Sequence, residues 1–123
     1  MAKKILIVED DPFILDIYSS QFKKEGYLID VATDGQMALE RIKNNGPDLV
    51  LLDIELPRMN GWDVLKVLRD DPVTKDLKVV IISNNNQEEA AQNIAKFNVL
   101  KYFLKIEHTA SDIIAQVKNM LKQ

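Results

Sequence analysis

The chain of 123 residues contains no cysteine, which excludes disulfide bonds as a source of stability. It also lacks any apolar run near the roughly 20 residues that a membrane-spanning helix requires. The apolar stretch closest to the amino terminus, Ile5 to Val8, is only four residues long, too short for the core of a secretory signal. Together these absences predict a cytoplasmic protein.

An excess of basic charge is absent too. The sequence has 16 lysines and arginines against 19 acidic residues, a net charge of −3 and a pI near 5.1. No basic stripe gathers on any segment, so we do not expect direct binding to nucleic acid. A glycine- or serine-rich loop for binding phosphate is also missing. The expected partners are therefore other proteins.

The composition is that of one ordinary globular domain. With 46% hydrophobic and 28% charged residues, the chain can form a stable core without a disulfide or a structural metal. A chain of this length buries roughly two thirds of the surface that it exposes when unfolded. We predict that residues 1–123 form a single domain, with no second domain for output.

Four short apolar runs are the most informative feature that is present, because each leads into a polar residue. The runs 5–8, 49–52, 79–82 and 102–104 are followed by Glu9-Asp10-Asp11, Asp53, Ser83 and Lys105. Continuous runs of β-branched residues and leucine are typical of strands that are buried on both faces, as in parallel sheets. With a shorter strand at 28–32, they predict an α/β fold of five strands alternating with five helices.

The segments between the strands have the periodicity of helices. In the first, Asp11 is expected to cap the helix, Pro12 to take its first position, and Phe13, Ile17 and Phe22 to line its buried face. The apolar faces predicted for the third and fourth helices are Val64, Leu65, Val67 and Leu68, and Ala90, Ala91, Ile94, Ala95 and Phe97. The fourth helix offers the least apolar area, so we expect it to be the loosest.

Parallel strands bring their carboxyl ends to one edge of the sheet, where open α/β sheets bind ligands. Glu9, Asp10 and Asp53 should therefore converge there, and their mutual repulsion should raise the pKa of at least one. A hard cation such as Mg²⁺ would relieve that repulsion. Asp53 beside Mg²⁺ and Lys105 is a plausible nucleophile toward phosphorus, with the Ser83 hydroxyl available to a phosphoryl oxygen.

Five segments resemble the receiver domain of two-component response regulators. They are Lys-Lys-Ile-Leu-Ile-Val-Glu-Asp-Asp-Pro at 3–12, Pro-Asp-Leu-Val-Leu-Leu-Asp at 47–53, Leu-Pro-Arg-Met-Asn-Gly at 56–61, Ile-Ile-Ser at 81–83 and Tyr-Phe-Leu-Lys at 102–105. The resemblance implies a flavodoxin-like, doubly wound parallel sheet in strand order 2-1-3-4-5, with helices on both faces. It also implies that Asp53 accepts a phosphoryl group from a phosphohistidine on a sensor histidine kinase or a phosphotransfer protein.

The same resemblance assigns roles to individual residues. It implies that Asp10 and Asp53 bind Mg²⁺ (or Mn²⁺) directly, that Glu9 acts through water, and that the main-chain carbonyl of Glu55 completes the protein ligands. By position, the switch hydroxyl, the switch aromatic and the catalytic lysine are Ser83, Tyr102 and Lys105. Phosphorylation would move the hydroxyl and turn the ring inward, which alters the surface of the fourth helix, fifth strand and fifth helix.

The implied protein is a single-domain regulator of the chemotaxis or phosphorelay type. It would catalyse phosphorylation of its own Asp53 and slow hydrolysis of the product, without turning over an external substrate. A downstream protein target would read the switched surface. The chain itself is expected to be a monomer, or a weak dimer that depends on phosphorylation.

Several positions depart from the family pattern. Ile106 replaces the usual proline after the lysine, and a cis bond before Ile106 would cost about 2.5 to 4 kcal/mol, so a trans bond is expected. Asn84 is larger than the usual residue after the switch hydroxyl, and Asn98-Val99 replaces a common Gly-Ala pair. We hypothesise a damped or retuned switch. Glu55, two residues beyond Asp53, is expected to face the phosphate position, where it would either orient or obstruct attacking water.

Two alternatives remain open. The chain could be a docking module that keeps the acidic pocket but signals without phosphorylation, which the altered Asn84 and Ile106 keep under consideration. It could also be a turnover enzyme, such as a small phosphatase with an aspartyl intermediate, or a flavin carrier. Against the phosphatase, no aspartate follows Asp53 by two residues as a general acid, although Glu55 stands there.

Overall fold

A computed structural model describes residues 2–122, apart from the side chains of residues 87 and 89. The described part contains five strands: β1 (Lys4–Val8), β2 (Leu28–Ala32), β3 (Leu49–Asp53), β4 (Lys78–Ser83) and β5 (Lys101–Leu104). All neighbouring strands pair in parallel, in the order β2-β1-β3-β4-β5. The predicted flavodoxin-like sheet is confirmed.

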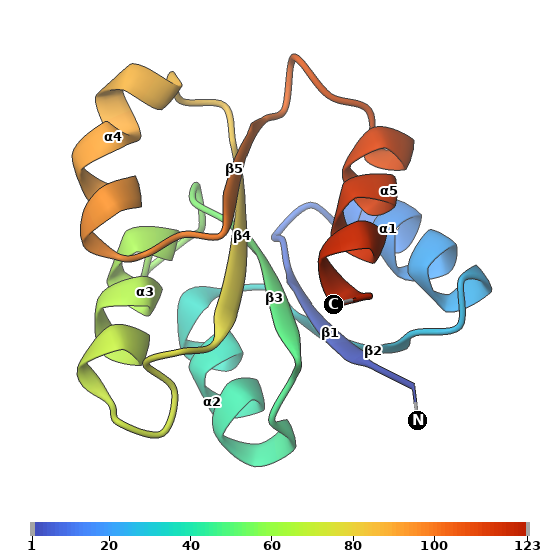
Figure 1. Ribbon diagram of the computed structural model, residues 1–123, viewed down its shortest axis with the longest axis horizontal. Coiled ribbons are helices and arrows are strands. Elements are labelled where there is room, and N and C mark those ends of the chain that lie inside the picture. Colours follow the sequence, from blue (N-terminus) through green and yellow to red (C-terminus); the bar gives the residue numbers. More distant parts are fainter. Residues whose placement is uncertain (1, 123) are drawn as a thin grey trace.

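Five helices cover the two faces of this sheet (Figure 1). They are α1 (Pro12–Lys24), α2 (Gly35–Asn45), α3 (Gly61–Asp70), α4 (Gln87–Lys96) and α5 (Ala110–Leu121). Helices α1 and α5 lie on one face, and α2, α3 and α4 lie on the other. None of them has both the length and the apolar character that crossing a bilayer requires.

Successive strand residues point to opposite faces, so the sheet separates two hydrophobic cores. The buried strand residues in the core beneath α2, α3 and α4 are Leu6, Val8, Ala32, Val50, Leu52, Val79, Ile81 and Tyr102. Those in the core beneath α1 and α5 are Ile5, Ile7, Leu49, Leu51, Val80, Ile82 and Phe103. Burial on both faces explains why these strands read as continuous apolar runs.

Backbone hydrogen bonds continue just past the strands and fix the positions of the residues at their carboxyl ends. The Glu9 N–H donates to the Ala32 carbonyl at 3.0 Å, and the Lys105 N–H donates to the Ser83 carbonyl at 2.9 Å. Asp53, the last residue of β3, pairs with Ile82 of β4. The polar residues at the carboxyl ends of β1, β3, β4 and β5 therefore meet at one edge of the sheet.

Helix α1 begins as predicted but buries a different face. Asp11 accepts the N–H of Phe13 at 2.9 Å as the cap, and Pro12 occupies the first position. The predicted burial of Phe13 and Ile17 is wrong, because their exposed fractions are 77% and 37%. Helix α1 instead packs through Tyr18 and Phe22, which are four residues apart and share one face. Helix α1 therefore carries more apolar side chains than it can bury against the sheet.

Helices α3 and α4 depart from the predicted faces in a similar way. Val67 is 46% exposed, whereas the predicted Val64, Leu65 and Leu68 are buried against α2 and the sheet. In α4, Ala90 is buried while Ala91 and Ala95 are exposed, and Ile94 is half-buried. Among its described side chains, α4 thus buries little apolar surface. That α4 is the loosest helix stays a prediction.

Close backbone approaches around Gly61 and Gly35 hold the loop after β3 in place. A Cβ atom on Gly61 would lie 2.9 Å from the Asp53 carbonyl oxygen, and one on Gly35 would lie 2.5 Å from the Met59 carbonyl oxygen. Neither position can take a side chain without a shift of the backbone. The glycines therefore let α3 start directly beside the end of β3.

Arg69 of α3 ties the carboxyl-terminal end of α4 to the body of the domain. Its Nε donates to the Phe97 carbonyl at 2.7 Å, and its Nη1 donates to the Lys75 and Leu77 carbonyls at 2.9 Å each. Asn98 follows with a φ of 51°, a left-handed conformation that asparagine tolerates in place of glycine. The end of α4 at Phe97 is thus held to the loop that leads into β4.

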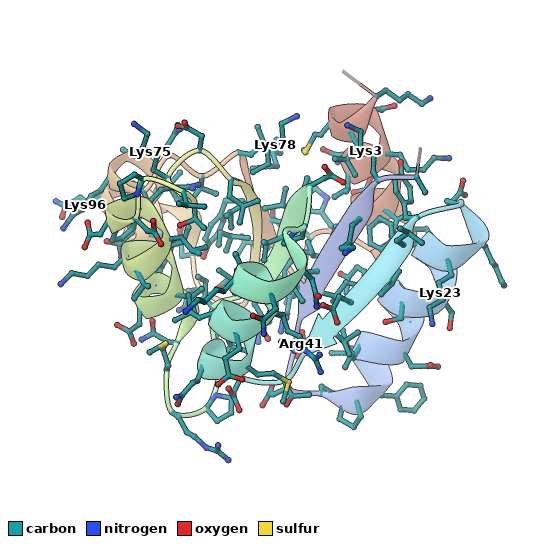
Figure 2. All side chains as sticks on the ribbon, turned by 90° about the horizontal axis from the view of Figure 1, so that it is seen from below. Lys3, Lys23, Arg41, Lys75, Lys78 and Lys96 are labelled. Atoms are coloured by element: carbon teal, nitrogen blue, oxygen red, sulfur yellow. The ribbon has the colours of Figure 1, made fainter. Side chains whose placement is uncertain are left out.

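Basic residues are distributed over the domain. Those labelled in Figure 2, Lys3, Lys23, Arg41, Lys75, Lys78 and Lys96, come from different elements and form no single stripe in this view.

Candidate functional site

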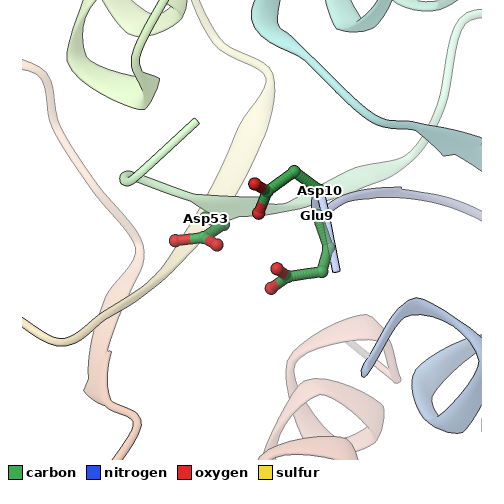
Figure 3. Close-up of side chains that lie close together, drawn as sticks. All are labelled: Glu9, Asp10 and Asp53. Carbon is green, nitrogen blue, oxygen red and sulfur yellow. The ribbon is translucent and has the colours of Figure 1, made fainter. Parts of the chain in front are cut away.

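Three carboxylates meet at the carboxyl ends of β1 and β3 (Figure 3). One oxygen atom each from Glu9, Asp10 and Asp53 lies within 4.8 Å of the other two. Glu9 and Asp53 are each only 1% exposed, whereas Asp10 is open to solvent. The structure thus brings together the three acids that the sequence pattern predicted to converge.

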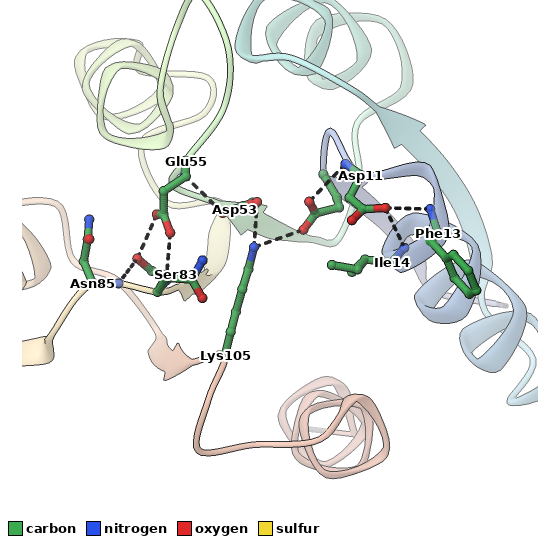
Figure 4. Close-up of polar contacts among 10 residues, drawn as sticks. Asp11, Phe13, Ile14, Asp53, Glu55, Ser83, Asn85 and Lys105 are labelled. Carbon is green, nitrogen blue, oxygen red and sulfur yellow. Dashed lines mark hydrogen bonds and ion pairs between the residues drawn. The ribbon is translucent and has the colours of Figure 1, made fainter.

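Lys105 enters this cluster from the end of β5 (Figure 4). Its Nζ donates to Asp53 Oδ2 at 3.0 Å and lies 3.5 Å from Glu9 Oε2. The bond between Lys105 and Ile106 is trans, as predicted, since no cis peptide occurs among the described residues. The missing proline therefore does not keep the ammonium from the carboxylates.

Burial controls the ionisation of the cluster. The pKa of Glu9 is raised to about 7, chiefly by burial and next by the negative charge of Asp53, while the Asp11 N–H and the Lys105 charge oppose the rise. Burial also raises the pKa of Asp53, although Lys105 and the Glu55 N–H oppose it. The predicted rise is confirmed, and its larger cause is loss of water rather than repulsion between the acids.

The ammonium responds in the opposite sense. Burial by itself lowers the pKa of Lys105, but its hydrogen bond to Asp53 and the charges of Asp53, Glu9 and Glu55 outweigh burial and raise it. Lys105 therefore stays charged at neutral pH. One cation faces three carboxylates, and the cluster is left with an excess of negative charge.

The donor set fits a hard divalent cation. Among residues 2–122, Glu9 Oε2 is buried without a hydrogen-bond partner, and the Nζ atom of Lys105 lies 3.5 Å from it. The three carboxylates supply oxygen ligands of the kind that Mg²⁺ prefers, and Asp10 is open to solvent. This opening suits Mg²⁺, which keeps several waters when it binds to proteins. The predicted roles of these oxygens, and of the Glu55 carbonyl, in binding the ion stay predictions.

Asp53 is held in a defined orientation. Its Oδ1 accepts the N–H of Glu55 at 3.1 Å, while Lys105 holds its Oδ2. The carboxylate is thus fixed by one contact on each oxygen at the end of the central, fully buried strand. A fixed carboxylate beside an ammonium and a cation site is suited to nucleophilic attack on phosphorus.

The Ser83 hydroxyl lies at the end of β4, where it is fully buried. In this structure it donates to Glu55 Oε2 at 2.8 Å, and its oxygen accepts the N–H of Asn85 at 2.9 Å. Glu55 Oε1 in turn accepts the N–H of Asn84 at 2.7 Å. Sequence reasoning placed Glu55 near the site but missed these contacts, since its side chain was expected to face a phosphate or water.

Tyr102 is packed inside the domain. Its ring stacks on Trp62 with centroids 6.4 Å apart, and Trp62 also stacks on Phe97 at 6.3 Å. The Tyr102 hydroxyl donates to the carbonyl of Asn85 at 2.8 Å. This bond ties β5 to the loop between β4 and α4, which also carries Asn84.

Known proteins share both the sequence pattern and the fold. Sporulation initiation phosphotransferase F of Bacillus subtilis is 33% identical over 105 residues, which are 85% of this chain and 83% of that protein. The DNA-binding response regulator MtrA of Mycolicibacterium smegmatis is 45% identical over 71 residues, which are 58% of this chain but 31% of MtrA. The chain thus spans under a third of MtrA but most of the phosphotransferase.

Solved structures with the same arrangement include a CheY-like response regulator receiver domain protein from Methanospirillum hungatei JF-1. It has a TM-score of 0.89 and 27% identity, over 99% of this chain and 95% of that one. The phosphorylated cyanobacterial phytochrome response regulator RcpA has a TM-score of 0.82 and 26% identity, over 98% of this chain and 91% of that one.

The match to a family extends over nearly the whole sequence. Residues 5–118 correspond to the response regulator receiver domain, and the matched segment includes every carboxylate of the cluster, Ser83 and Lys105. The fold, the converging acids and the similar proteins all agree. This chain belongs to the receiver domain family of two-component response regulators.

Proposed function

We propose that Asp53 accepts a phosphoryl group from a phosphohistidine in a reaction that depends on Mg²⁺. The supporting observation is the environment of Asp53, which is buried, held on Oδ1 by the Glu55 N–H and on Oδ2 by Lys105, and adjacent to Glu9 and Asp10. In the transfer, a new P–O bond forms to Asp53 while the P–N bond breaks, and the imidazole keeps its electron pair. The product is an aspartyl phosphate.

The charges of the cluster suit this transfer. Lys105, whose pKa is raised by its acidic neighbours, neutralises negative charge that develops on the phosphoryl oxygens. Asp10 and Asp53 would bind Mg²⁺ directly, Glu9 through water, and Glu55 through its main-chain carbonyl. The ion, when bound, supplies charge stabilisation for the transferring group. Slow hydrolysis of the aspartyl phosphate would reset the protein, without an external substrate.

Phosphorylation would be read at the surface of α4, β5 and α5. Ser83 is the last residue of β4, and Lys105 directly follows the neighbouring strand β5. Tyr102 connects β5 to the loop before α4 through its bond to the Asn85 carbonyl. A shift of Ser83 toward the phosphoryl group would move this loop. A downstream protein that binds the two forms differently would sense the change.

The phosphodonor would dock over the apolar rim, which we define as Phe13, Ile17 and Ile106. Phe13 is 77% and Ile106 is 84% exposed, and these side chains lie on α1 and on the loop that carries Lys105. A cavity of about 190 Å³ is lined by Ile17 and by Lys105 itself. Exposed apolar groups beside a reactive carboxylate fit a protein donor, a histidine kinase or phosphotransfer protein acting in the cytoplasm.

Phosphorylation of Asp53 is tested by intact-mass spectrometry after treatment with acetyl phosphate and Mg²⁺. We expect a mass gain of one phosphoryl group. Asp53→Asn should abolish the gain, because an amide replaces the nucleophilic carboxylate. Asp70→Asn, an exposed carboxylate on α3, serves as the matched control and should keep the gain. Wild-type protein that gains no mass, or an Asp53→Asn variant that gains as much, would contradict the proposal.

The ionisation of Glu9 predicts how stability depends on pH without metal. Because the folded pKa is about 7 against an ordinary 4.5, ionisation of Glu9 disfavours the fold, and stability falls as pH rises from about 4.5 to 7. Glu9→Gln should therefore be about 1–3 kcal/mol more stable than wild type at pH 8 but not at pH 4.5.

Urea unfolding at both pH values in a chelating buffer measures this difference. Mg²⁺ at pH 8 should stabilise the wild-type protein, because the ion offsets the charge of ionised Glu9. Equal stability of the two proteins at pH 8 would show that Glu9 ionises freely in the fold.

Docking over the apolar rim is tested by comparing two phosphodonors. Phe13→Ala should slow transfer from a phosphorylated phosphotransfer protein about 5- to 30-fold, the effect of losing one buried aromatic contact. Its reaction with acetyl phosphate should stay at the wild-type rate. Val73→Ala removes another strongly exposed apolar side chain, 90% exposed, from the loop between α3 and β4 and is the control. Equal slowing by both variants would remove the rim from the donor interface.

A further inference from the structure

Glu55 links the end of β3 to the end of β4 through its side chain (Figure 4). One carboxylate oxygen accepts the Ser83 hydroxyl at 2.8 Å, and the other accepts the Asn84 N–H at 2.7 Å. The Ser83 hydroxyl has one hydrogen and donates it to Glu55, while its oxygen accepts the Asn85 N–H. We call Glu55, Ser83 and Asn84 the Glu55 clamp.

The clamp lies in the same crevice as the phosphoacceptor. Asp53 pairs with Ile82, the residue before Ser83, and the Glu55 N–H donates to Asp53 Oδ1. The charge of Glu55 also contributes to the raised pKa of Lys105. The Glu55 carboxylate thus contacts Ser83 and acts through its charge on Lys105, the two groups that would face a phosphoryl group on Asp53.

A hydroxyl and a backbone N–H that point at one anion form a small anion site. The carboxylate of Glu55 fills it here, and phosphoryl oxygens would accept from the same two donors. Glu55 is exposed at its outer side, so its side chain can leave the donors for water. Two anions cannot share one pair of donors, and like charges at this spacing repel.

We propose that Glu55 is a positioning residue that competes with the phosphoryl group on Asp53 for the Ser83 hydroxyl and the Asn84 N–H. This inference rests on the proposed function, and it assigns to the side chain of Glu55 a task separate from its main-chain carbonyl. The clamp holds Ser83 away from Asp53 until the phosphoryl group displaces it. The strength of the clamp therefore sets how readily the site holds that group.

The clamp also explains how occupancy of the site reaches α4. Asn84 is followed by Asn85, whose carbonyl accepts from Tyr102, and by Asn86, whose side chain caps α4 through the Glu88 N–H at 2.7 Å. Release of Asn84 frees the first residue of this short loop. The far end of α4 stays held by Arg69, so motion is confined to the amino-terminal end of the helix.

The test uses beryllofluoride with Mg²⁺, a stable analogue of the phosphoryl group, titrated into the full chain by calorimetry. Glu55→Ala should bind the analogue roughly tenfold more tightly than wild type, because two donors are released from a charged acceptor. Glu55→Gln keeps one neutral acceptor and should fall between the two. In a Ser83→Ala background, Glu55→Ala should give a smaller gain, since one contested donor is absent. Glu107→Gln, an exposed carboxylate on the loop after β5, is the charge-matched control and should bind like wild type.

A second readout needs no phosphoryl analogue. In the metal-free protein, amide exchange of Asn84 should be at least about tenfold faster in Glu55→Ala than in wild type or Glu107→Gln, because the N–H loses its acceptor. Wild-type binding of beryllofluoride with no gain in Glu55→Ala would overturn the competition and leave the proposed function standing. Unchanged exchange at Asn84 would overturn the clamp itself. Failure of wild type to bind the analogue or gain mass from acetyl phosphate would overturn both proposals.

Discussion

Two buried carboxylates, Glu9 and Asp53, share one lysine at the edge of the sheet, and this shortage of positive charge governs the site. Burial disfavours the ionised form of each acid, while Lys105 compensates for only part of the charge. A crevice in that condition would attract a divalent cation and, with the cation bound, would accept an incoming phosphoryl group. The excess of negative charge that disfavours the fold is therefore also the property on which the proposed phosphoryl transfer depends.

The fold keeps this charge imbalance in place. Two apolar cores pack against the sheet, one on each face. The strand ends therefore cannot separate to relieve the repulsion between the carboxylates. Gly61 brings the start of α3 against the end of β3, which fixes the loop carrying Glu55. Two loops that the sequence marks as unusual, around Asn84 and Ile106, still deliver their donors to the crevice.

Much of this was predictable because it depends on pattern. Apolar runs buried on both faces indicate parallel strands. Parallel strands place Glu9, Asp53, Ser83 and Lys105 at one edge of the sheet, independently of how the helices pack. Helix faces were less predictable: α1 has more apolar residues than the sheet covers, so periodicity could not tell Phe13 from Tyr18. The contact of Glu55 with Ser83 depends on loop geometry and a rotamer, for which the sequence carries no signal.

The most direct test of the central claim is a crystal structure grown with Mn²⁺ and measured at the manganese absorption edge. The charge imbalance predicts an anomalous peak between Asp10 and Asp53, with Lys105 still beside Asp53. A saturated crystal with no peak at this edge of the sheet would contradict it, because the three carboxylates would then be stable without a cation.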